Sequence, residues 1–190
     1  MVKKYKWILL VIILVVVVAG AGMLYNNLSK DYNYDSTQGY DKNSSQNEKV
    51  QAPNFVVLDY QGNEVSLDDF KGKPVVLNFW ATWCNYCKVE MLDFDKAYKE
   101  YPEVQFMMID ATDGVQETID GAKAYVEDNN FEFDVFFDTK LEAVNNYYVT
   151  GFPMTFFIDA DGFVVAKANG MINYETLDKW IKITMGEETP

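Results

Sequence analysis

The stretch Val75-Val76-Leu77-Asn78-Phe79-Trp80-Ala81-Thr82-Trp83-Cys84-Asn85-Tyr86-Cys87 contains the only two cysteines of the chain, directly after an almost continuous apolar run. The run predicts a strand at the centre of a sheet that is covered on both faces. The residues after Cys87 follow a helical pattern, so the cysteines lie where a strand turns into a helix. A helix N-terminus stabilises a thiolate, and such a pair can cycle between dithiol and disulfide. We therefore interpret Cys84 and Cys87 as a redox-active pair.

Two other interpretations of the cysteine pair fit less well. As a structural cross-link, a disulfide across so short a loop contributes only about 2 kcal/mol in the chain-entropy model. A zinc site needs two further ligands. Because the chain has no other cysteine and no histidine, only carboxylates could supply them. The sequence thus predicts redox chemistry with no bound metal and no other cofactor.

The composition is that of an acidic globular protein. Apolar residues make up 49% of the 190 positions, and the formal net charge is −13. This charge disfavours nucleic acid or an anionic membrane surface as the main partner. The chain also has neither histidine nor arginine. Their absence excludes a histidine base, an imidazole metal site and a guanidinium clamp.

Residues 1–24 are expected to form a membrane anchor or a signal segment. Three lysines, Lys3, Lys4 and Lys6, precede an uncharged stretch over 7–24 that is just long enough to span a bilayer as a helix. This charge placement favours a cytoplasmic N-terminus and an extracytoplasmic domain. A cleaved signal peptide is the alternative, with a cleavage site at residues 19–21. The length of the apolar stretch favours the uncleaved anchor.

Residues 52–187 are expected to form one domain, which a flexible polar linker over 25–51 joins to the anchor. The apolar patterns and turn residues predict strands over 55–58, 64–66, 74–80, 104–110, 135–137, 154–158 and 163–168. Three helices are predicted: one after the cysteines, one over 115–126 and one near the end of the chain. A further helix between the strands over 135–137 and 154–158 is left open. This order indicates an α/β fold with one central mixed sheet and helices on both sides.

Two motifs resemble those of a known family. Residues 79–90 are similar to the active-site segment of thioredoxin-fold proteins, and most similar to that of the membrane-tethered TlpA/ResA-type thiol–disulfide oxidoreductases. Residues 151–159, Gly-Phe-Pro-Met-Thr-Phe-Phe-Ile-Asp, resemble the second signature of that fold, whose proline is cis and faces the cysteines. The N-terminal β-hairpin and a central helix-strand insertion around 115–138 also match this group. The resemblance covers about 53–186 and implies a thioredoxin-like fold.

The resemblance also implies roles at the site. Cys84 would be the attacking thiol, and Cys87 the resolving thiol that breaks the mixed disulfide with the partner. Trp83 would shield the pair on one side. Pro153, if cis, would hold a strand edge near the sulfurs, where the backbone of Phe152 could pair with an extended substrate peptide. On the pattern alone, Pro153 is more typical of an ordinary loop proline.

Glu90 is the third candidate catalytic residue. It lies three residues after Cys87, so on a helix it shares a face with the sulfurs. The TlpA/ResA-type family carries an acidic residue at this position near its active site. A carboxylate beside a thiol disfavours the thiolate and can exchange its proton. On spacing alone, a solvated helix glutamate is the more common interpretation.

The sequence departs from the patterns of relatives at three places. Asn78 occupies the place of the buried aspartate of ordinary thioredoxins, which suits either reliance on Glu90 or plain sheet packing. The dipeptide Asn85-Tyr86 replaces a pair that ends in proline, so the redox potential of a relative does not transfer to this chain. Leu92 stands where relatives often have a helix-kinking proline, and the helix is expected to run straighter.

These features predict an extracytoplasmic, membrane-anchored thiol–disulfide oxidoreductase that reduces disulfides of exported proteins through Cys84 and Cys87. The resemblance implies a membrane thiol carrier as electron donor, and the domain is expected to be monomeric. An oxidant or isomerase of secreted proteins is the main alternative, although Glu90 would oppose the stabilised thiolate it needs. A thiol peroxidase needs Thr or Ser where Ala81 stands, and an arginine. A copper-binding module of this fold would need a histidine.

Overall fold

The computed structural model describes residues 14, 37–39 and 50–187. The chain divides into two units, Met1–Asp35 and Ser36–Pro190. Leu14, a helical residue with 63% exposure, is the part of the first unit that is described. Apart from Leu14, the predicted anchor over 1–24 lies outside the described residues, and so does most of the predicted linker over 25–51. Within the described ranges, no helix is both long and apolar enough to cross a membrane.

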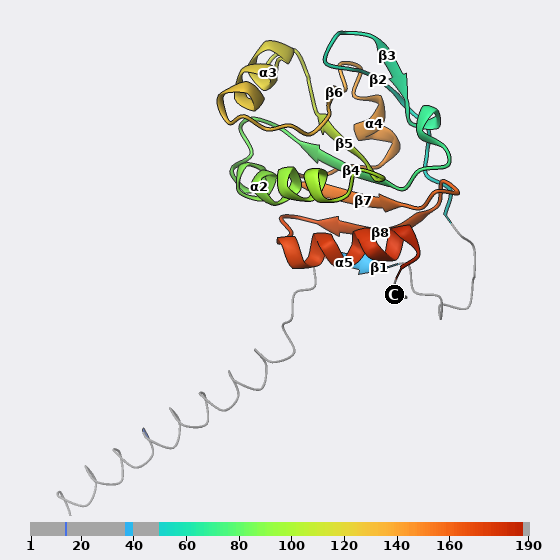
Figure 1. Cartoon of the computed structure of the whole chain (residues 1–190). Helices are drawn as coiled ribbons and strands as arrows, with labels where there is room; N and C mark the ends of the chain where they lie inside the picture. The colour runs from blue at the N-terminus through green and yellow to red at the C-terminus, as the bar shows by residue number, and fades with distance from the viewer. Residues whose placement is uncertain (1–13, 15–36, 40–49, 188–190) are drawn as a thin grey trace, which may run out of the picture. The chain divides into compact units, whose positions relative to one another are not determined.

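A sheet of eight strands forms the centre of the second unit, counted over the described residues, in the order β1-β8-β7-β4-β5-β6-β2-β3 (Figure 1). The three strands β4, β5 and β6 are parallel, and the other neighbouring pairs are antiparallel. The prediction of a mixed sheet is thus confirmed. The strands are β1 (Thr37–Gly39), β2 (Val56–Leu58), β3 (Glu64–Ser66), β4 (Val75–Trp80), β5 (Gln105–Asp110), β6 (Val135–Phe137), β7 (Met154–Ile158) and β8 (Val164–Asn169).

Helices cover both faces of the sheet, as predicted. Residues of α2 (Asn85–Glu100), α3 (Ile119–Asp128) and α5 (Tyr174–Met185) pack into the core on one face, and α4 (Glu142–Asn146) packs on the other. Figure 1 shows α2 and α5 side by side over the strands β4, β7 and β8. A short 3-10 helix, η1 (Leu67–Phe70), follows the β2–β3 hairpin. The arrangement is a thioredoxin-like α/β fold.

Strand β4 explains how the site is positioned, because it is buried on both faces. All six of its residues are buried, and successive side chains of a strand point to opposite faces. Val76 and Trp80 pack in the core under α2, whereas Leu77 and Phe79 pack in the core beside α4. The same alternation directs Asn78 toward α2. The apolar run therefore anchors the cysteine loop at the centre of the sheet.

The predicted helix over 115–126 begins later than its apolar pattern indicates. In the structure α3 starts at Ile119, after the N-cap Thr118, and Val115 is 89% exposed. The reason is local: Asp113 Oδ1 accepts hydrogen bonds from the N–H groups of residues 115, 116 and 117, which forms a turn in place of the first helical turn. The prediction was therefore wrong at this end of the helix.

The predicted linker also contains a strand that its composition does not indicate. Thr37–Gly39 forms β1, which pairs antiparallel with β8 at the edge of the sheet. At the other end of the linker, Val50 O accepts a hydrogen bond from Val164 N at 2.9 Å, and Gln51 bridges to Phe163. The ordered sheet thus begins before residue 52, where the domain was predicted to start.

Candidate active site

Cys84 and Cys87 form a disulfide at the junction between β4 and α2. Cys84 is the N-cap of α2, and its Sγ accepts a hydrogen bond from Cys87 N at 3.1 Å. Cys84 is 5% exposed and Cys87 is fully buried. When the pair is reduced, the helix dipole and the N–H groups of the first turn favour a thiolate at Cys84. The predicted strand-to-helix placement of the cysteines is confirmed.

The second motif lies beside the first. The Phe152–Pro153 peptide bond is cis, as the resemblance implies. Because Met154 pairs with Phe79 across β7 and β4, this loop reaches the end of β4 that leads into the cysteines. The rings of Trp83 and Phe152 meet edge to face, with centroids 5.6 Å apart. Trp83 and Phe152, one predicted site residue from each motif, are thus neighbours although they lie 69 positions apart in the sequence.

Glu90 lies inside the protein, on the buried face of α2, and is 1% exposed. Its Oε1 accepts a hydrogen bond from Asn78 Nδ2 at 2.9 Å, and its Oε2 accepts one from Ile172 N at 3.0 Å. Burial raises the pKa of Glu90 to about 8, although these two hydrogen bonds act in the opposite direction. The solvated helix glutamate that spacing alone favours is therefore not what the structure contains.

Asn78 connects Glu90 to the sheet. Its Nδ2 also donates to Thr155 Oγ1 at 3.0 Å, on the neighbouring strand β7. Its Oδ1 is buried and has no hydrogen-bond partner within the described residues. Asn78 is therefore more than a packing residue, because it holds the carboxyl of Glu90 next to the helix turn that carries Cys87.

Glu117 is a site residue that the sequence analysis missed. It is 1% exposed, and its Oε2 accepts hydrogen bonds from Thr82 N at 2.7 Å and from Thr82 Oγ1 at 2.8 Å. Thr82 lies two residues before Cys84, so the loop before α3 is fastened to the cysteine loop. No spacing rule connects residues 35 positions apart. The one signal for Glu117 was an acidic residue in the turn before α3, whose other residues are exposed.

A second buried carboxyl lies close to Glu117. Asp110, at the end of β5, is fully buried and pairs with Trp80 across the parallel strands. Burial is the main cause that raises the pKa of Asp110 to about 8, and the negative charge of Glu117 adds to it. Asp110 therefore holds its proton around neutral pH.

We expect Glu117→Ala to destabilise the cysteine loop. The substitution leaves the Thr82 N–H and hydroxyl without their acceptor, which costs about 1–3 kcal/mol when such groups are shielded from water. Glu117→Gln is the matched control, because its carbonyl oxygen still accepts a hydrogen bond, and its loss should be smaller. Urea unfolding followed by tryptophan fluorescence measures both variants. Equal losses in the two variants would contradict the role of this acceptor.

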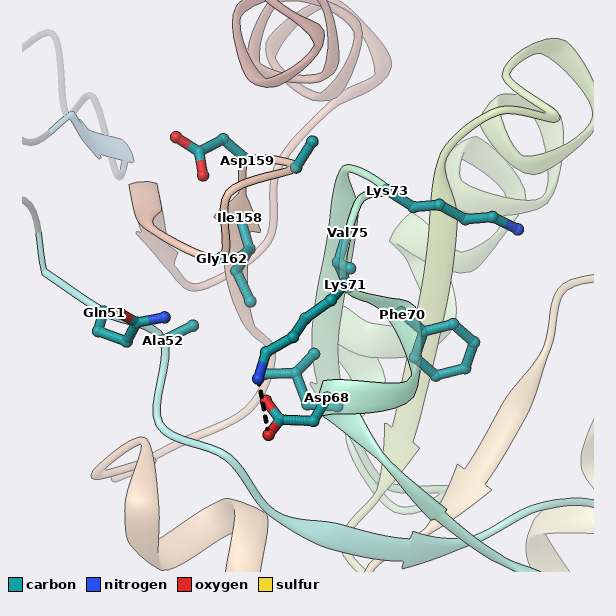
Figure 2. A pocket seen from close by; sticks show the side chains of 12 residues that line it. Gln51, Ala52, Asp68, Phe70, Lys71, Lys73, Val75, Ile158, Asp159 and Gly162 are labelled. Carbon is teal, nitrogen blue, oxygen red and sulfur yellow. Dashed lines mark ion pairs between the residues drawn. The ribbon is translucent and has the colours of Figure 1, made fainter.

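A hollow elsewhere on the domain is not a candidate for the reaction. Figure 2 shows it between η1 and the β7–β8 turn, with the ion pair between Lys71 Nζ and Asp68 Oδ2 at 2.9 Å. It is lined by Val75 and Ile158, which lie at the end of the sheet opposite the cysteines.

Among the described residues, no group of three or more His, Cys, Asp or Glu side chains is arranged to hold a metal ion.

Comparison with known proteins agrees with this geometry. Residues 49–167 match the AhpC/TSA family. The chain belongs to the AhpC/TSA family. The thiol-disulfide oxidoreductase ResA of Bacillus cereus (strain ATCC 10987 / NRS 248) is 36% identical over 187 residues, which cover 95% of this chain and 97% of the relative. The ResA of Bacillus subtilis (strain 168) is 31% identical over 138 residues, 73% of this chain and 76% of that protein.

A solved structure supports the same assignment of this AhpC/TSA-family chain. The putative thiol:disulfide interchange protein DsbE from Chlorobium tepidum superimposes with a TM-score of 0.65 and 27% identity, over 74% of this chain and 99% of that one. The relatives and the fold together make this protein a thioredoxin-like thiol–disulfide oxidoreductase. The resemblance inferred from the two motifs is thereby confirmed, whereas the roles of the individual site residues stay predictions.

Proposed function

We propose that the protein reduces disulfides of specific exported proteins through the Cys84/Cys87 dithiol. The thiolate of Cys84 attacks one sulfur of the substrate disulfide, which forms a mixed disulfide and releases the first substrate thiolate. Cys87 then attacks Cys84 Sγ, so that the second substrate thiolate leaves and the protein disulfide forms. Two electrons pass to the substrate, and the two thiol protons of the protein balance the two thiols produced.

The observation that carries this proposal is the burial of Glu90 one helical turn after Cys87. Its pKa of about 8 lies near the ordinary pKa of a thiol, about 8.5, so a proton can pass between the two groups at little cost. The ionised carboxyl also raises the energy of a neighbouring thiolate. Glu90 thereby favours electron donation by the dithiol and disfavours a strongly oxidising disulfide.

The substrate would bind beside the cis proline. Within the described residues, the backbone N–H and C=O of Phe152 take part in no hydrogen bond, so they are available to an extended peptide. Trp83 lies against the Phe152 ring and would contact the same peptide. Pro153 is buried, and its carbonyl oxygen accepts a hydrogen bond from Gly170 N at 2.9 Å. This hydrogen bond fixes the loop that presents Phe152.

The cellular setting is part of the proposal. We infer that residues 1–24 anchor the chain in the cell membrane, with the N-terminus in the cytoplasm, and that the catalytic domain works outside the cytoplasm as a monomer. Much of residues 25–51 would serve as the tether. A membrane thiol carrier would return electrons to Cys84 and Cys87. The alternative is that the domain is cleaved from this segment and secreted. A mass measurement of the native N-terminus distinguishes the cleaved chain from the anchored one.

The reduction potential of Cys84/Cys87 tests the direction of electron flow. We expect a potential near or below about −250 mV, in the range of thioredoxin, from equilibration of the full chain in dithiothreitol or glutathione buffers. A potential of about −120 to −180 mV would identify an oxidant or isomerase instead. Failure of the pair to cycle would leave a structural disulfide and contradict both functions.

A further inference from the structure

An apolar ridge runs along the exposed side of α2, starting at the disulfide. It consists of Tyr86, Val89 and Leu92, whose side chains are 67%, 61% and 69% exposed. They follow one another at intervals of three residues, which makes successive members neighbours on a helix surface. Tyr86 stands between Cys84 and Cys87, so the ridge is continuous with the reactive pair.

Two segments next to α2 carry further exposed apolar side chains. Trp83, directly before Cys84, is 48% exposed, and Met171 is 42% exposed. The hydrogen bond from Ile172 N to Glu90 Oε2 brings the loop that carries Met171 against α2. These five residues are five of the nine large hydrophobic side chains that are exposed among the described residues. Such a concentration beside one site is typical of an interaction surface, whereas scattered exposed side chains are not.

Charge is sparse on this surface, although the chain contains 29 acidic residues. Between Trp83 and Leu92 the only carboxyl belongs to Glu90, which is buried. The only cation of that stretch, Lys88, lies over the ring of Tyr125, with Nζ 5.3 Å from the centroid. Lys88 is exposed, and Asp93, directly after Leu92, is partly exposed. A partner therefore meets uncharged side chains along the ridge and single charges at its edges. The net charge of −13 repels an anionic bilayer, which favours a protein over a lipid surface.

We propose that the surface formed by Trp83, Tyr86, Val89, Leu92 and Met171 docks an apolar segment of the protein substrate, directly adjacent to the substrate's cysteine. The inference rests on the proposed function, because it requires a substrate disulfide at Cys84. The six-residue rise from Tyr86 to Leu92 is about 9 Å along the helix, which about three residues of an extended chain match. The surface thus selects cysteines flanked by about three bulky uncharged residues.

Two disulfide-bonded peptides of equal length test this selection with the full chain in detergent micelles. In one, the cysteine is followed by Leu-Phe-Leu, and in the other by Ser-Asn-Ser. The wild type is expected to reduce the apolar peptide with a kcat/KM about ten times that of the polar peptide. The double variant Val89→Asn, Leu92→Asn should lower this ratio to near one, because the ridge then offers polar side chains.

Val50→Asn is the matched control. Val50 is an exposed aliphatic residue, 42% accessible, and it pairs with Val164 at the end of the sheet opposite the cysteines. This variant should keep the wild-type ratio. Equal reduction of both peptides by the wild type, or an unchanged ratio in the double variant, would overturn the docking site and leave the reductase intact. Reduction of neither peptide would overturn the reductase and the docking site together.

The same assay separates a protein partner from a lipid surface. The full chain is reconstituted in phosphatidylcholine vesicles, and the ratio of kcat/KM is measured again. We expect the preference for the apolar peptide to persist. A preference that is present in micelles and lost in the vesicles would mean that lipid covers the ridge, and it would overturn the proposal.

Discussion

Cys84→Ala is expected to lower the rate of disulfide reduction to that of the uncatalysed background, whereas Cys87→Ala should accumulate a mixed disulfide with the substrate. Cys84 caps α2 and retains 5% exposure, while Cys87 is fully buried. A substrate sulfur therefore reaches Cys84 first, and without Cys87 no thiol is positioned to release it. Insulin reduction measures the first effect, and non-reducing gels with mass spectrometry detect the second.

The two variants are each other's control, because each removes one sulfur and the same disulfide. Their stabilities should therefore fall by similar amounts, while their chemistry differs. Substrate trapped on Cys87 in Cys84→Ala, with none trapped in Cys87→Ala, would mean that the order of the two thiols is reversed. Loss of activity in both without any trapped species would point to a structural disulfide.

Glu90→Gln is expected to make the free energy of unfolding less sensitive to alkaline pH. The folded-state pKa of Glu90 is about 8, above its ordinary value of 4.5. Between these two values the unfolded chain has lost the proton and the folded chain keeps it, so stability falls as pH rises, and below pH 4.5 both states are protonated. At 1.36 kcal/mol per pKa unit, the full cost above pH 8 is on the order of 5 kcal/mol.

Urea unfolding of the oxidised chain at pH 5 and pH 9 measures this effect. At pH 9 the variant should exceed the wild type by several kcal/mol, whereas at pH 5 the two should agree within about 1 kcal/mol. Asn78 can rotate its amide so that its unpartnered Oδ1 accepts from the new amide, which limits the loss at pH 5. Asp110 shares the elevated pKa, so part of the pH dependence remains in the variant.

Glu175→Gln provides the control, because Glu175 is an exposed residue of α5 and its loss leaves the buried carboxyl in place. It should reproduce the wild-type stability at both pH values. A redox readout separates catalysis from stability: in the reduced protein, thiol alkylation of Glu90→Gln should begin at lower pH, since no carboxylate opposes the thiolate. An alkylation profile identical to that of the wild type would leave Glu90 with a structural role alone.

Local patterns were sufficient where the physical cause acts within one element. The alternation of β4 places Asn78 on the face of α2, because strand side chains alternate by geometry. Helical spacing places Glu90 on the same face as Cys87, for an equally local reason. Where a side chain competes with the backbone, the pattern misled: the apolar period over 115–126 predicted a helix, and the carboxylate of Asp113 formed a turn instead.

The sequence by itself determined the pairing of Cys84 with Cys87 in one motif, its strand-to-helix setting, the mixed α/β sheet and the family, because two motifs and the apolar periods encode them locally. Only the tertiary structure decided whether Glu90 meets water or the interior, and that Glu117 holds Thr82. It also revealed that β1 extends the sheet at β8. These features depend on contacts between residues 35 to more than 100 positions apart. Burial and its effect on pKa arise from what covers a side chain, and that is a property of the assembled core.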